Sequence, residues 1–156
     1  MEKEKISTLR VQSIAFSHNG HIPPQYTCEG ENFNPAVEIS NVPPDTKTLA
    51  LIMEDPDAPR GIFVHWLLWN LTPHNPIVEK TNQGISGKNS FGKIGYGGPC
   101  PPSGTHRYYF RVYALDVALD LETGANKDSL IEAMKDHILA SGELMGLYSK
   151  KGKNNL

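Results

Sequence analysis

The chain has 156 residues, of which 38% are hydrophobic and 21% charged, and its formal net charge is -2. This composition is neither that of a disordered chain nor that of a membrane-spanning one, since no apolar run approaches the roughly eighteen residues of a transmembrane helix. The slightly acidic balance does not favour nucleic-acid binding. We therefore expect one domain over residues 1–156, with frayed ends at 1–6 and 150–156, no transmembrane segment and no nucleic-acid partner.

The N-terminus and the cysteines bear on the cellular compartment. The charged start from Met1 to Lys5 is not followed by a hydrophobic stretch of signal-peptide length, so we expect a cytoplasmic protein. The two cysteines, Cys28 and Cys100, form no CxxC motif, which leaves zinc and a redox dithiol unsupported. Both lie in loops that could converge, so a disulfide stays open, but a reducing cytosol disfavours it.

Strand patterns dominate most of the chain. Period-two alternation or short apolar runs predict strands at 9–16, 36–39, 49–53, 62–71, 106–114 and 143–148. In the fourth run, alternation places His65 on one face with Leu67 and Trp69. Residues 72–105 are rich in Gly, Pro, Asn and Ser and predict a long loop, which is often functional in a compact domain.

One helix is predicted late in the chain. Ser129 and Glu132 have the spacing of a capping box, and Ser141-Gly142 is a plausible stop. The apolar stripe that follows the cap consists of Leu130, Ala133, Met134, His137 and Ile138. We interpret His137 as a structural residue on that stripe. The fold class is therefore mainly β with a peripheral C-terminal helix.

Two carboxylates, an imidazole pair and a phenol are the candidate functional groups. Asp55 and Asp57 lie in a proline-rigidified turn between two strands, and His65 is carried back into the sheet by the second strand. His106 and Tyr108 project from one face of a later strand. If these strands meet, a carboxylate accepts from a ring nitrogen and favours the charged imidazole, which suits a phosphate or carboxylate ligand.

A glycine run adds a second source of donors. Gly97 and Gly98 precede Pro99, and glycines let backbone N–H groups turn toward an anion in a nest. Each signal alone has an ordinary structural interpretation, because strand histidines are usually packed, and Gly-Gly-Pro and Asp-Pro-Asp are usually turns. A second strand face is either an aromatic-basic binding surface or an ordinary exposed one; it carries Arg107, Tyr109, Arg111 and Tyr113.

Together, these segments resemble the phosphatidylethanolamine-binding protein family, also called the Raf-kinase-inhibitor-like family, and its prokaryotic branch in particular. The resemblance rests on Asp-Pro-Asp-Ala-Pro at 55–59 followed by His65-Trp66, and on Gly-Tyr-Gly-Gly-Pro-Cys-Pro-Pro at 95–102 leading to Gly-Thr-His-Arg-Tyr at 104–108. It implies two antiparallel β-sheets with Greek-key features and a small anion pocket. By motif, the pocket walls are Asp55, Asp57, His65, Gly97, Pro99, His106 and Tyr108.

The resemblance also implies a function. Family pockets bind phosphate-like groups, including phospholipid head groups, so we expect a non-enzymatic anion-binding protein without catalytic residues, cofactor or metal. A partner kinase or protease and a homodimer are further expectations. Only residues 60–64 separate Pro59 from His65, where eukaryotic members have a longer insertion, and the tail shows no helical pattern. These departures put kinase regulation of the eukaryotic kind in doubt.

Three alternatives stay open. A phosphoester hydrolase would use His65 and His106 as acid and base with Asp55 as the orienting group. A metal site would take the same three residues as ligands. An inhibitor would bind a protease or kinase through its surface rather than its pocket.

Overall fold

Residues 7–150 are described by a computed structural model and fold mainly as β-strands. The elements are β1 (Ser7–Thr8), β2 (Arg10–Gln12), the 3-10 helix η1 (Pro24–Tyr26), β3 (Glu38–Ser40), β4 (Thr48–Asp55), β5 (Phe63–Leu71), β6 (Ile85–Ser86), β7 (His106–Leu115), α1 (Lys127–Met134) and β8 (Ile138–Tyr148). The predicted frayed ends lie outside the described residues, except for Lys150. Within residues 7–150, no helix has the length and apolar character needed to cross a membrane.

Six strands form one sheet in the order β1-β8-β7-β4-β5-β6, and β2 pairs with β3 in a second sheet. The strands β4, β5 and β6 are antiparallel neighbours, and β7 returns to lie beside β4. This spatial order is that of a Greek key. The predicted class is confirmed, with one refinement: the larger sheet is mixed because β1 runs parallel to β8.

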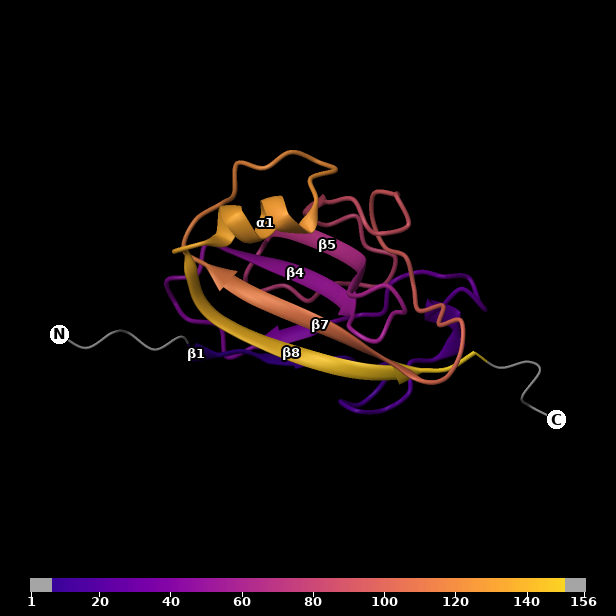
Figure 1. The fold of residues 1–156 in the computed structure, drawn as a ribbon. Coiled ribbons are helices and arrows are strands. Elements are labelled where there is room, and N and C mark those ends of the chain that lie inside the picture. The colour runs from indigo at the N-terminus through magenta and orange to yellow at the C-terminus, as the bar shows by residue number, and fades with distance from the viewer. Residues whose placement is uncertain (1–6, 151–156) are drawn as a thin grey trace.

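The central part of the large sheet is buried on both faces. One face, which we call the N-terminal face, packs against the segments before β4 through Phe16, Ile22 and Val37. The other, the helix face, is covered by α1, whose Leu130 and Met134 are buried (Figure 1). Every residue of the central strand β4 is buried as a result. The candidate pocket lies on the N-terminal face.

A β-bulge corrects the predicted direction of His65. Uninterrupted alternation placed His65 with Leu67, but the register of β5 against β4 shifts by one residue between Met53 and Glu54. Leu67 packs on the helix face, whereas the His65 ring contacts Tyr108 of the N-terminal face. Bulges re-aim side chains in this way, because the extra residue reverses the alternation. The bulge therefore brings His65 to the pocket.

The helix begins and ends earlier than predicted. Asn126, not Ser129, is the N-cap, and its side chain accepts from the Ser129 backbone amide. The helix ends at Met134, and the chain enters β8 at Ile138 after Asp136 with φ of 69°. Pairing with β7 along the whole of β8 outweighs the helical pattern, so the predicted stop at residues 141–142 lies within a strand.

His137 is consequently not part of an apolar stripe. It lies between α1 and β8, and its Nδ1 is 2.8 Å from Oδ1 of Asp116. Both side chains of this pair are exposed. The structural interpretation of His137 as a packed helix residue is therefore wrong, since the helix ends before it.

The cap assignment predicts a difference between two alanine variants. Asn126→Ala removes the acceptor for the Ser129 amide and is expected to lower the free energy of unfolding by about 1 kcal/mol. Ser129→Ala keeps that backbone amide and its acceptor, so it is expected to change stability by much less. Urea denaturation of both variants measures the difference, and equal losses would contradict the assignment of Asn126 as the cap.

Candidate anion-binding site

A cavity of about 170 Å³ lies where one end of β4 meets the neighbouring ends of β5 and β7. Four of the seven predicted site residues line it: Asp55, His65, His106 and Tyr108. Asp55 is the last residue of β4 and His106 the first of β7, so antiparallel pairing brings them to the same edge. The other three predicted residues, Asp57, Gly97 and Pro99, do not line the cavity.

Asp55 and His106 form a buried pair. The carboxylate Oδ2 accepts from Nδ1 of His106 at 2.6 Å, and its Oδ1 accepts from the Asp57 backbone amide at 2.7 Å. Both side chains are almost fully buried. The hydrogen bond fixes the tautomer of His106 and leaves Nε2 as its ring nitrogen for a ligand. Asp55 therefore acts on a ligand through His106.

His65 is held in the opposite way, by a backbone carbonyl. Its Nδ1 donates to the Gly97 carbonyl at 2.6 Å, so Nε2 is again the nitrogen left for a ligand. Burial lowers the pKa of His65, and the Gly97 carbonyl and the Asp55 charge only partly oppose this effect. The neutral ring is therefore favoured in the unliganded protein, and the charged ring requires a compensating negative charge.

Tyr108 lies beside both histidines. Its ring centroid is 5.2 Å from that of His65 and 6.4 Å from that of His106. The hydroxyl is buried and lies close to the Asp55 carboxylate and the Cys100 backbone, although no hydrogen bond of good geometry reaches it within residues 7–150. Burial, and then the Asp55 charge, raises the pKa of this phenol well above its usual range. The group is therefore a neutral O–H donor at the cavity wall.

The Asp57 carboxylate is hydrogen-bonded to an arginine and is therefore not available to a ligand. Its Oδ2 accepts from the backbone amide and Nε of Arg107, both at 2.9 Å, and its Oδ1 accepts from Nη2 at 2.7 Å. These hydrogen bonds lower the pKa of Asp57 to about 2. Asp57 thus ties the 55–59 turn to the first residues of β7 and fixes the spacing between Asp55 and His106.

The predicted glycine nest is wrong. The Gly97 amide donates to the His65 carbonyl at 2.9 Å, and the Gly98 amide donates to Oδ1 of Asn32 at 2.8 Å. A Cβ on Gly98 would lie 2.1 Å from the Tyr26 carbonyl oxygen, so this glycine permits close loop packing. Pro99 accepts from a backbone amide of the same neighbouring loop. Both glycine amides are therefore already engaged within the fold.

The model of the phosphatidylethanolamine-binding proteins matches residues 12–149, and these residues include the whole cavity. The chain belongs to the phosphatidylethanolamine-binding protein family. A UPF0098 protein of Archaeoglobus fulgidus is 46% identical over 96% of this chain, which spans only 54% of that relative's length. A UPF0098 protein of Methanothermobacter thermautotrophicus is 44% identical over 91% of this chain and 99% of its own.

Solved structures of the family have the same fold. The putative phosphatidylethanolamine-binding protein homologue CT736 of Chlamydia trachomatis superposes with a TM-score of 0.89 at 43% identity, covering 93% of this chain and 99% of CT736. YbcL of E. coli, described as a member of the mammalian family, superposes with a TM-score of 0.85 at 26% identity, covering 93% and 100% of the two chains. The family resemblance seen in the two motifs is therefore confirmed.

Aromatic residues of this family member complete the cavity. Phe63 and Phe91 line it, with ring centroids 4.7 Å apart, and both rings pack against His65. Phe63 shares the alternation of His65, so the strand pattern contained a signal for it. Phe91 lies in the irregular segment 72–105, where no periodicity indicates direction. The Phe91 ring also explains why residue 97 is a glycine, because a Cβ at this position would lie 2.5 Å from the ring.

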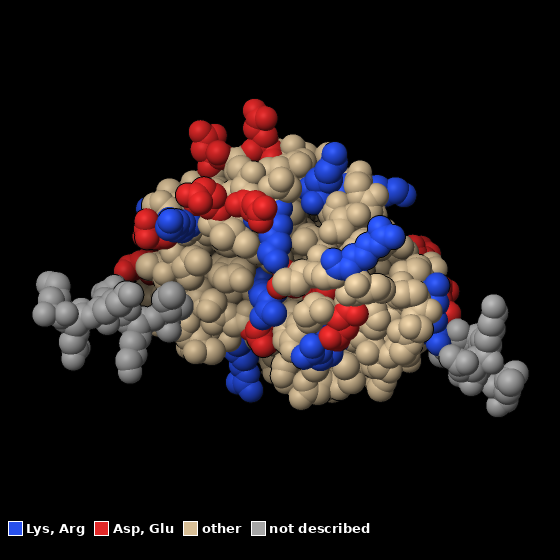
Figure 2. Space-filling model, in the orientation of Figure 1, with Lys and Arg blue, Asp and Glu red and all other residues tan. Residues whose placement is uncertain are grey.

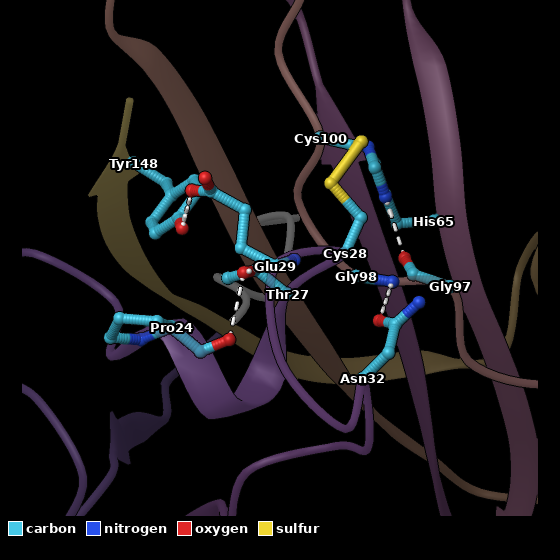
Figure 3. Close-up of a disulfide and its surroundings, with 10 residues drawn as sticks. All are labelled: Pro24, Thr27, Cys28, Glu29, Asn32, His65, Gly97, Gly98, Cys100 and Tyr148. Atoms are coloured by element: carbon cyan, nitrogen blue, oxygen red, sulfur yellow. Dashed lines mark hydrogen bonds between the residues drawn. A yellow bond between two sulfur atoms is a disulfide. The ribbon is translucent and has the colours of Figure 1, made fainter. Parts of the chain in front are cut away.

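Cys28 and Cys100 form a disulfide, which corrects the expectation that they are unpaired (Figure 3). Their Cα atoms are 5.4 Å apart although 72 positions separate them in the sequence. The Cys28 amide donates to the Pro99 carbonyl at 3.1 Å, so backbone pairing brings the two loops together. The expectation rested on the compartment, whereas convergence of the loops was the alternative left open.

The positive charges on the second face of β7 are paired with carboxylates. Arg107 is paired with Asp57, and Arg111 contacts both Glu54 and Glu143. Figure 2 shows acidic and basic side chains close together on this side of the protein. These pairs make the aromatic-basic strand face an ordinary salt-bridged surface.

A metal site has no support in the described residues. Across residues 7–150, no group of three His, Cys, Asp or Glu side chains has the geometry to hold a metal ion. Nδ1 of His65 and Nδ1 of His106 are both engaged, which leaves one ring nitrogen of each for a ligand. The site of this family member is accordingly a set of hydrogen-bonding groups in an apolar-walled cavity.

Proposed function

We propose that this protein is a non-enzymatic binding protein for a small anion, a phosphate or a phosphorylated head group, held between His65 and His106. The observation that carries the proposal is the pair of imidazoles at the cavity, each of which is held through Nδ1 and leaves Nε2 for a ligand. When protonated, each ring donates from Nε2 to a ligand oxygen. A hydrogen bond to a charged group contributes about 1.5–3 kcal/mol.

The charges around the cavity support an anionic ligand. The negative charge of Asp55 is directed at His106 and the Asp57 amide, and the charge of Asp57 is paired with Arg107. Apolar walls strengthen any hydrogen bond to a charged oxygen, because the local dielectric is low. A protonated imidazole therefore binds an anion more strongly in this cavity than it does in water.

The side chains at the cavity favour binding over catalysis. The sulfur of Cys100 is held in a disulfide, so it is not a thiolate nucleophile. The raised pKa of Tyr108 keeps its phenol protonated. Asp55 has both oxygens engaged. These lining groups thus suit the recognition of an oxyanion, and none of them is an activated attacking group.

A binding titration with inorganic phosphate and with phosphoethanolamine tests the proposal. We expect both to bind the wild type, and His106→Ala to weaken binding at least about tenfold, as loss of a charged hydrogen bond does. Tyr108→Phe removes only the hydroxyl and is expected to weaken binding as well. His137→Ala is the matched control, since it removes a histidine far from the cavity that is paired with Asp116.

The outcomes separate the candidate functions. Equal affinity of the wild type and His106→Ala would contradict a histidine-based pocket. Absence of binding to the wild type would overturn the proposal and favour action through the protein surface, as in the inhibitor alternative. Release of phosphate from phosphoethanolamine during the titration would instead favour the hydrolase alternative.

A further inference from the structure

The disulfide joins a residue of the cavity wall to an exposed residue. Cys100 lines the cavity and is half-buried, whereas Cys28 is exposed. Exposed disulfides are the ones that thiols reduce readily, since attack requires access to a sulfur atom. Because Cys28 is an exposed residue, the disulfide lies at the surface of the domain.

The residues joined by the disulfide also position His65. The Gly97 carbonyl that accepts from His65 lies three residues before Cys100 (Figure 3). Between them, the Gly98 amide donates to Asn32 of the Cys28 loop. Hydrogen bonds and one covalent bond thus connect the Cys28 loop to the backbone that holds the imidazole.

Few hydrogen bonds hold the two loops at this point. Residues 27–34 and 95–102 contain no strand, and single hydrogen bonds join them, such as the Cys28 amide to the Pro99 carbonyl at 3.1 Å. One backbone bond, from the Gly97 amide to the His65 carbonyl, ties the second loop to β5. Segments with few ladder hydrogen bonds open at low free energy. The disulfide is the covalent tie between the two loops, and it reinforces the hydrogen bonds that hold Gly97 against His65.

We propose that the Cys28–Cys100 disulfide is a redox-sensitive latch on the anion pocket, so that its reduction by a dithiol weakens anion binding. The step is a thiol–disulfide exchange, in which a thiolate of the dithiol attacks the sulfur of Cys28, the more exposed of the two residues, and the bond between the two cysteine sulfurs breaks. Two electrons and two protons pass to the protein, which gains two thiols, while the dithiol closes to its own disulfide. This inference rests on the proposed anion-binding function.

The test compares phosphate affinity in three states of the protein. These are the oxidised wild type, the wild type reduced with dithiothreitol, and the double variant Cys28→Ser/Cys100→Ser. We expect the second and third to bind at least about fivefold more weakly than the first, a typical coupling between linked sites. Reoxidation is expected to restore the affinity of the wild type, while dithiothreitol leaves the double variant unchanged. Circular dichroism checks that each state is folded.

Thermodynamic linkage between phosphate binding and disulfide reduction supplies a second test, which does not need the double serine variant. If reduction weakens phosphate binding fivefold, saturating phosphate must make the disulfide fivefold harder to reduce, a shift of about 20 mV for this two-electron couple. Thiol counting across a series of dithiol buffers, with and without phosphate, measures this shift. An unchanged midpoint would overturn the latch even if the double variant failed to fold.

Controls separate the latch from general destabilisation and from the pocket itself. Leu130→Ala opens a cavity under the helix, on the face of the sheet opposite the pocket, and keeps the disulfide; we expect its oxidised form to bind phosphate with wild-type affinity. Failure of the oxidised wild type to bind phosphate would refute the proposed function. Equal binding by oxidised and reduced wild type would leave that function standing and refute the latch alone.

Discussion

Replacing Cys28 and Cys100 with serine is expected to lower the free energy of unfolding by about 4 kcal/mol. The bond joins positions 72 residues apart, so it removes much of the conformational entropy of the unfolded chain. Domains are usually stable by only about 5–15 kcal/mol, so the loss is a large fraction of the total. Urea denaturation followed by circular dichroism measures it.

Reduced wild type provides the control for this stability prediction. It is expected to unfold at the same urea concentration as the double serine variant, because both lack the cross-link. A loss below about 1 kcal/mol would contradict the expectation and would indicate that the unfolded chain keeps the two loops close without the bond. Stability and anion affinity are separate readouts, so this result does not depend on the proposed ligand.

Anion affinity is expected to rise as the pH falls, by up to about tenfold per pH unit. The pKa of His65 is lowered chiefly by burial, so the unliganded protein holds a neutral ring. A bound anion favours the protonated ring and so raises the pKa of His65 in the complex. At pH values between the pKa of the unliganded protein and that of the complex, anion binding therefore takes up a proton. Asp55, His106 and Tyr108 are the other ionisable groups that face this ring.

Sulfate is the ligand of choice for this measurement, because phosphate itself titrates near neutral pH. Calorimetric titrations at several pH values between 5 and 8 give the slope, and His65→Asn, which retains a hydrogen-bonding side chain without the titration, is expected to flatten it. Sulfate affinity that does not change with pH would contradict proton uptake by His65. Phosphate binding without sulfate binding would point to a neutral ring that accepts from a protonated ligand oxygen.

The unliganded protein is expected to respond to pH in the opposite direction. The folded pKa of His65 lies below its unfolded value of about 6.5, so the unfolded chain binds more protons. The contribution of His65 to stability is therefore present above pH 6.5 and is lost as the pH falls toward the lowered folded value. Saturating sulfate is expected to offset this loss, which urea denaturation at two pH values will show.

The sequence by itself determined the strand content and the chemical identity of the pocket. Alternation and turn residues are local signals, and they placed Asp55 at a strand end and His106 with Tyr108 on one face. All three residues line the cavity because antiparallel pairing of β4 with β7 brings them to one edge. The two motifs that contain them also carried the resemblance to the family.

Only the tertiary structure decided how these residues are held. The bulge in β5 reverses the alternation before His65, and it depends on the register with β4, which the sequence of one strand does not specify. The end of α1 also depends on tertiary contacts, because pairing of β8 with β7 outweighs the helical pattern that predicted a longer helix. The disulfide and the engaged amides of Gly97 and Gly98 depend on contacts between loops far apart in the chain. Periodicity contains no information on such contacts, because it describes only the neighbours of a residue along its own segment.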